Sequence, residues 1–92
     1  GFLITCKEGT DRNQVVQHIE KMGVQTRMLF AGNLVKHPCF DEMRKNGEGF
    51  RVVGSLEHTD RILKDTFWVG VYPGMTDEMI DYMAKTIREA IA

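Results

Sequence analysis

The stretch DTFWVGVYPGMTDEM, residues 65–79, changes abruptly from aromatic and apolar residues to acidic ones, and it decides the fold. Its first part, FWVGVY at residues 67–72, has no polar alternation, which predicts a strand buried on both faces. Gly70 within this run predicts a bulge or the close approach of a bulky group. The Pro-Gly pair that follows predicts a turn, and Thr76 then predicts the N-cap of a helix.

The segment after Thr76 predicts the last helix. Asp77 and Glu78 would lie at its positive end, where the helix dipole favours carboxylates. Apolar residues then recur at helical spacing, which predicts one inner face. The expected inner-face residues are Ile80, Met83, Ile87 and Ile91.

The N-terminal part predicts a strand, a helix and a second strand. GFLITC, residues 1–6, is rich in apolar and β-branched residues, which favour strands. A helix is expected next, with Thr10 or Asp11 as its N-cap and Gly23 at its C-terminal stop. Residues 24–30 alternate between two faces, which is the period of a strand.

The middle of the chain is less regular. The tripeptide AGN predicts a turn, and a short helix is expected to begin near Pro38. FRVVG, residues 50–54, predicts a brief strand. Residues 55–66 predict a helix that is capped by Ser55 or Thr59.

These elements alternate as four strands and four helices, which are too few and too mixed in length for a doubly wound sheet. They predict an α+β fold in which helices pack on one face of a short antiparallel or mixed sheet. The chain has 92 residues, and a chain of this size buries only about two-thirds of its unfolded surface. We therefore expect a single domain, residues 1–92, with a thin core. Because the chain opens on Gly1 rather than Met, we expect a fragment of a longer protein.

Charge and composition exclude several classes of partner. Charged residues make up 27% of the chain and the formal net charge is -1, which gives no electrostatic footprint for nucleic acid or an anionic membrane. No apolar run approaches the roughly 18 residues of a membrane span, and the N-terminus lacks the basic and apolar regions of a signal peptide. We expect a cytoplasmic protein with no nucleic-acid and no membrane partner.

Local motifs predict neither a metal site nor a catalytic site. Cys6 and Cys39 form no C-x-x-C pair, and the three histidines lack the spacing of metal ligands. The chain contains no G-x-S-x-G, G-x-x-x-x-G-K or G-x-G-x-x-G motif. We expect two reduced, buried cysteines and no complete active site.

Three blocks of the sequence resemble a known family: TRMLFAGNLVKHPCF, RVVG and HTDRILKDTFWVGVYPGMTDEM. They resemble the C-terminal portion of sugar-modifying enzymes with the aspartate-aminotransferase fold, the type I pyridoxal phosphate proteins. LFAGN and DTFWVGVYPG most resemble the CDP-4-keto-6-deoxy-D-glucose-3-dehydrase branch, whose members are often called lipopolysaccharide biosynthesis proteins. The resemblance spans nearly all of the chain.

The resemblance implies a small C-terminal domain that closes over the substrate, while a large domain outside this sequence holds the cofactor. It implies a homodimer, with pyridoxal or pyridoxamine phosphate in that large domain and a His in place of the Schiff-base Lys. Such enzymes remove the C3 hydroxyl of a nucleotide-linked 4-keto sugar. One subgroup holds an iron-sulfur cluster through closely spaced cysteines, a motif that Cys6 and Cys39 do not reproduce.

The resemblance also implies substrate-binding roles. Arg27 would hold a phosphate or carboxylate in bidentate fashion, or else be a solvated strand arginine. Phe30 would stack on the sugar or pack in the core, and Asn33 would hydrogen-bond a sugar hydroxyl. Arg61 is a second anion-binding candidate, or a helix-surface arginine paired with a nearby aspartate. Phe2 would edge the active site or belong to the core.

Trp68 and Tyr72 are expected at a contact with the large domain or the dimer partner. A strand without a polar face in so small a domain needs cover on both sides, and amphipathic aromatic residues suit such interfaces. The alternative is that this strand lies wholly inside the domain's own core. Two other functions stay open, the small domain of a sugar aminotransferase and a free-standing α+β ligand-binding module. The reading frame upstream of this sequence would separate the module from the enzymes.

Overall fold

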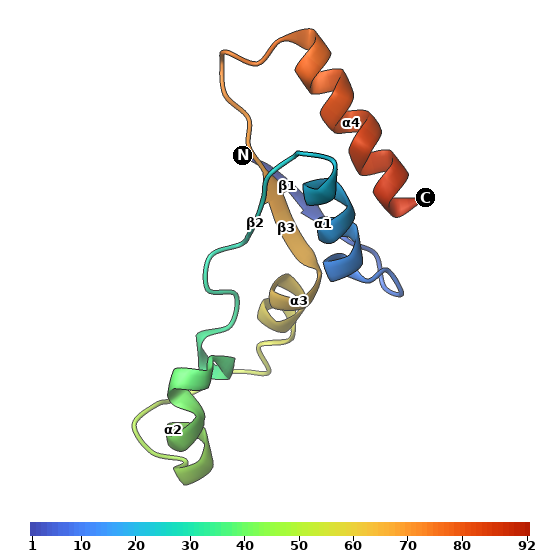
Figure 1. Ribbon diagram of the computed structural model, residues 1–92. Coiled ribbons are helices and arrows are strands. Elements are labelled where there is room, and N and C mark those ends of the chain that lie inside the picture. The colour runs from blue at the N-terminus through green and yellow to red at the C-terminus, as the bar shows by residue number, and fades with distance from the viewer.

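The computed structural model describes residues 1–92 and centres on a three-stranded antiparallel sheet (Figure 1). The middle strand is β3, Thr66–Val69, which lies between β1, Phe2–Thr5, and β2, Thr26–Met28. The predicted α+β class is confirmed, and of the two sheet types left open the antiparallel one is present. The sheet has three strands rather than the expected four.

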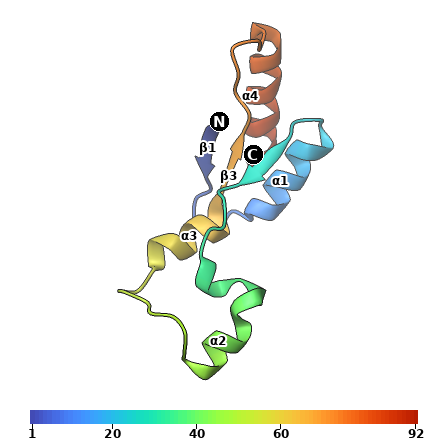
Figure 2. The same cartoon turned by 90° about the vertical axis from the view of Figure 1, so that its left-hand side faces the viewer.

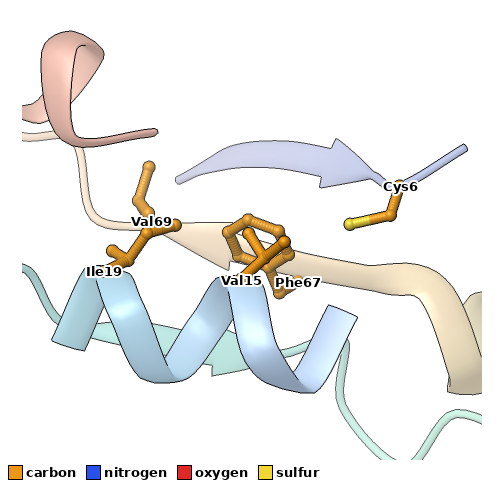
Figure 3. Close-up of a cluster of buried hydrophobic side chains, with 5 residues drawn as sticks. All are labelled: Cys6, Val15, Ile19, Phe67 and Val69. Carbon is orange, nitrogen blue, oxygen red and sulfur yellow. The ribbon is translucent and has the colours of Figure 1, made fainter. Parts of the chain in front are cut away.

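Helix α1, Arg12–Lys21, covers one face of the sheet. Of the two predicted caps, Asp11 is the one used, because its Oδ1 accepts hydrogen bonds from the backbone N–H groups of Asn13 (2.9 Å) and Gln14 (3.4 Å). The helix turns its apolar side toward β3, where the buried core forms (Figure 3). The core residues are Cys6, Val15, Ile19, Phe67 and Val69.

Helix α4, Asp77–Ile91, packs beside α1 on the same side of the sheet (Figure 2). Thr76 caps it as predicted, since its hydroxyl accepts a backbone N–H at 3.2 Å. Of the predicted inner-face residues, Met83 and Ile87 pack against the core. Ile80 and Ile91 are 45% and 55% exposed. None of the helices is both long and apolar enough to cross a membrane.

Residues 29–56 join β2 to helix α3, Glu57–Asp65. They form an arm that leads away from the sheet. The arm contains two 3₁₀ turns, η1 (Leu34–Lys36) and η2 (Pro38–Phe40), and then helix α2, Asp41–Asn46. The short helical segment expected to begin near Pro38 is therefore confirmed. Because α2 and α4 lie at opposite ends of the molecule (Figure 1), the radius of gyration is 16.4 Å, against about 12 Å for a compact chain of this length.

Three local predictions are wrong. Residues 50–54 form no strand, because they belong to the arm, where Phe50 lines a groove beside α2, far from the sheet. Helix α3 is capped by neither Ser55 nor Thr59; its N-cap is Leu56, which has no side-chain hydrogen-bond acceptor. Gly70 makes no bulge and no group of this chain approaches it closely, and the strand expected over residues 67–72 ends at Val69, since Val71 and Tyr72 are more than half exposed.

Candidate functional site

One face of the sheet is not covered by the helices. We call it the open face, and it consists of Leu3, Thr5, Arg27, Thr66 and Trp68. Leu3 and Arg27 lie directly opposite Trp68 on the outer strands, so these side chains form a row across the sheet. Leu3 is 52% exposed, Arg27 is exposed and Trp68 is half-buried. The row unites two predicted site residues, Arg27 and Trp68. On this face of β3, Thr66 is only 1% exposed and Trp68 is half-buried, so the cover within this chain is incomplete at Trp68.

A carboxylate holds the strand that carries Arg27. Glu20, near the end of α1, accepts hydrogen bonds through Oε1 from the Thr26 backbone N–H (3.1 Å) and hydroxyl (2.8 Å). Arg27 donates from Nη1 to the Thr26 carbonyl oxygen (3.1 Å). The Thr26 hydroxyl, then its N–H, and the charge of Arg27 lower the pKa of Glu20. Glu20 therefore ties α1 to β2 in its ionised form.

We expect Thr26→Val to raise the pKa of Glu20 toward its ordinary value of 4.5, because the hydroxyl donor is lost. The folded pKa of Glu20 is lower than the unfolded one. The stabilisation from this contact is therefore present above pH 4.5 and is lost as the pH falls through the folded pKa. NMR titration of the Glu20 side-chain carboxyl carbon measures the shift. Identical titration curves for the wild type and Thr26→Val would contradict the assignment.

The turn after β2 carries Phe30 and Asn33. Phe30 is 89% exposed, so packing in the core, the alternative left open for it, is wrong. Asn33 is buried, and both ends of its amide are used within the chain. Its Nδ2 donates to Oδ1 of Asp60 (2.7 Å), and its Oδ1 accepts the N–H of Val35 (3.1 Å). A bond from Asn33 to a sugar hydroxyl stays a prediction.

Arg61 lines a polar groove of about 800 Å³ between α3 and the loop before α1. Its Nε lies 3.8 Å from Oδ2 of Asp65, one helical turn on, which is the aspartate pairing left open for it. More carboxylates than cations line this groove, so its net charge opposes an anion there. Arg12, which sequence patterns did not single out, donates from Nη1 to the carbonyl oxygens of Leu63 (2.8 Å) and Thr66 (3.0 Å). It joins the start of α1 to the junction of α3 and β3.

Phe2 and Tyr72 lie away from the open face. Phe2 pairs with Val69, so it points to the helix side, where it is 60% exposed and lines an apolar groove of about 490 Å³ beneath α4. Tyr72 is 55% exposed and lines a second groove, of about 760 Å³, between the end of α1 and the start of α4. The predicted site residues therefore fall into separate regions, with only Arg27 and Trp68 in direct register.

No three His, Cys, Asp or Glu side chains come close enough together to hold a metal ion. Cys6 is buried in the core, and this burial, followed by the nearby Asp65 carboxylate, raises the pKa of its thiol. Cys39 is exposed because the arm that carries it does not reach the core. The prediction of two buried cysteines is therefore wrong for Cys39.

Comparison with known proteins agrees with the resemblance. The chain matches the DegT/DnrJ/EryC1/StrS aminotransferase family over residues 1–88. It is 44% identical, over 97% of its length, to lipopolysaccharide biosynthesis protein RfbH of Salmonella typhimurium. It is 42% identical, over 100% of its length, to dTDP-4-dehydro-2,6-dideoxy-D-glucose 3-dehydratase of Saccharopolyspora spinosa. The chain spans only 20% and 19% of these relatives' own lengths. The predicted family is confirmed: this chain belongs to the DegT/DnrJ/EryC1/StrS aminotransferase family.

Proposed function

We propose that residues 1–92 are the small, substrate-covering domain of a nucleotide-sugar 3-dehydratase in deoxysugar and lipopolysaccharide biosynthesis. The parent enzyme would remove the C3 hydroxyl of a nucleotide-linked 4-keto-6-deoxyhexose, with pyridoxamine or pyridoxal phosphate as its cofactor. The observation that carries this proposal is the identity of 44% and 42%, across almost the whole chain, to relatives named for these roles. The chain alone would be inactive, as the small domain of a pyridoxal phosphate transferase fold.

The open face supports a covering role. Its row of Leu3, Trp68 and Arg27 places two large apolar side chains and a cation on a surface that no helix of this chain covers. Exposed apolar surface of this kind marks a contact with another body, and aromatic and Arg residues are enriched at such contacts. We infer that the parent's large domain or its homodimer partner covers this face. Tyr72 stays a predicted residue of the same contact.

The residues of this chain do not fit the cofactor itself. The polar groove has no apolar side chain against which a pyridine ring could pack, and its one aromatic ring is the imidazole of His58. Its carboxylates (Glu8, Asp11, Glu57, Asp60 and Asp65) outnumber its cations (Arg12, Arg61 and Lys64), which disfavours a phosphate. The apolar groove beneath α4 contains neither a Lys nor a His. We therefore assign the cofactor, and any iron-sulfur cluster, to the part of the parent outside this sequence.

Arg27 and Phe30 are the substrate contacts that the geometry favours most. Both are exposed, and both lie on β2 or in the turn directly after it. Arg27 would bind the diphosphate of the nucleotide, and Phe30 would stack on the sugar. Three residues remain weaker candidates. Arg61 pairs with Asp65, Phe2 points to the helix side of the sheet, and Asn33 is buried.

We expect Arg27→Ala in the full-length enzyme to lower kcat/KM at least roughly tenfold, because a charged hydrogen bond to the substrate is lost. Arg27→Lys should recover only part of this, since an ammonium cannot bind a phosphate in bidentate fashion. Arg51→Ala is the matched control, an exposed arginine on the arm. Steady-state assays with CDP- and dTDP-linked 4-keto sugars measure these values. An Arg27→Ala enzyme as active as the Arg51→Ala control would remove Arg27 from the site.

The family description favours one second candidate, a sugar aminotransferase. Absorbance of the purified full-length protein with added pyridoxal phosphate separates the two, because only a Schiff-base lysine gives a stable internal aldimine. We expect no such band, together with loss of the C3 hydroxyl from a 4-keto sugar substrate. A stable aldimine band and amino transfer would favour the aminotransferase. A reading frame that encodes these residues alone would favour the free-standing module instead.

A further inference from the structure

The turn that begins the arm holds Phe30 in a strained backbone conformation. Its φ is 46°, in the left-handed region that bulky residues rarely adopt. The only other non-glycine residue with a positive φ is Leu56 at the far end of the arm, and its side chain is partly buried. Phe30 is 89% exposed, so packing of its ring within the chain does not offset this strain. Other contacts of the turn must hold it.

Contacts with α3 fix the backbone just after Phe30. Gly32 lies against Leu63, because a Cβ at position 32 would be 2.6 Å from Leu63 Cδ1 and 3.2 Å from its Cα. The N–H of Gly32 donates to the carbonyl oxygen of Leu29 (3.1 Å), which closes the turn. The next residue, Asn33, is only 3% exposed. The turn is therefore held tightly against α3.

Asp60 of α3 is the polar centre of this contact. Its Oδ1 accepts the hydrogen bond from Asn33 Nδ2 (2.7 Å) and lies 3.0 Å from Nζ of Lys36. The hydrogen bond from Asn33, and then the contact with Lys36, lower the pKa of Asp60, so its side chain is a carboxylate at neutral pH. Lys36 ends η1, whose N-cap is Asn33. One carboxylate thus holds both ends of the first turn of the arm.

We propose that Asp60 is a positioning residue that, through Asn33 and Lys36, holds the turn so that Phe30 projects toward the nucleotide sugar. The inference rests on the proposed function, because it assigns the Phe30 ring to the substrate. Removal of the carboxylate leaves a buried amide donor without its acceptor, and movement of the turn then also releases the strain at Phe30. The core residues belong to other segments of the chain, so this movement leaves the core intact.

A double-mutant cycle in the full-length enzyme tests the coupling. We expect Asp60→Ala to lower kcat/KM roughly tenfold, mainly through KM, and Phe30→Ala to lower it at least as much. In the Phe30→Ala background, Asp60→Ala should cause no further loss beyond about twofold, because Asp60 acts through that ring. Asp60→Asn should recover part of the activity, since its amide oxygen still accepts from Asn33. Asp81→Ala, at an exposed aspartate of α4, is the control.

Amide hydrogen exchange gives a readout that does not need activity. We expect Asp60→Ala to speed exchange in residues 32–36 at least roughly tenfold, without a change in α1, while Asp81→Ala changes neither. Unchanged exchange in residues 32–36 would overturn the proposal. The proposal would also be overturned if the reductions in kcat/KM from Phe30→Ala and Asp60→Ala multiplied in the double variant. A wild-type enzyme without dehydratase activity would instead overturn the proposed function, and the exchange comparison would still show whether Asp60 holds the turn.

Discussion

Phe67→Ala is expected to lower the free energy of unfolding of this chain by about 3–5 kcal/mol. Phe67 is 0% exposed and lies on the central strand, at the middle of a core with only five buried apolar residues. A chain of this length has a total stability of about 5–14 kcal/mol. The substitution therefore removes a large share of that stability. Urea titration followed by circular dichroism, at matched protein concentrations, measures the loss.

Phe2→Ala is the matched control for Phe67→Ala. Both phenylalanines point to the helix side of the same sheet, but Phe2 lies on an edge strand and is 60% exposed. Its truncation removes less buried area, so we expect a loss of about 1 kcal/mol. Equal losses from the two substitutions would show that the core is not centred on β3.

Much of the fold can be predicted because it follows from local pattern. The caps Asp11 and Thr76, and the apolar periodicity that follows each of them, predict α1 and α4. The strand period predicts β2, and the aromatic run predicts the central strand β3. These features depend on neighbours within a few residues, which is why sequence alone reveals them.

The arm shows where local pattern fails. Residues 50–54 have the composition of a strand, yet a strand needs a partner, and the sheet lies at the other end of the arm. Leu56 takes the N-cap position of α3 although its side chain cannot accept a hydrogen bond, and its backbone has the left-handed conformation at the end of the arm. Both outcomes depend on where distant segments lie. Propensity in a short window does not contain that information.

The candidate site divides in the same way. Its chemistry can be predicted, since Arg27, Phe30 and Trp68 are singled out by residue type and by family resemblance. Their arrangement cannot, because the register that places Arg27 opposite Trp68 joins strands far apart in the sequence. The role of Asp60 was hidden for the same reason. Its bond to Asn33 spans 27 residues, and no local motif marks it.

Trp68→Ala has the second large expected effect, and this effect depends on what covers the open face. In the 92-residue chain alone, where Trp68 is half-buried, we expect a loss of stability of about 1 kcal/mol. In the full-length enzyme, a tryptophan at the centre of a covered contact is worth at least about 2 kcal/mol more. Hydrogen exchange of the β3 amides in both proteins measures the difference, which corresponds to roughly a 30-fold faster exchange.

The same contact predicts the behaviour of the isolated chain. With its open face uncovered, the 92-residue chain should bind a hydrophobic dye or form a dimer that hides Leu3 and Trp68, and Trp68→Ala should weaken either. Phe50→Ala is the control, because Phe50 is 40% exposed but lies on the arm. A monomer in the ultracentrifuge that binds no dye would contradict the covering role. An equal effect of Phe50→Ala would move the contact from the open face to the arm.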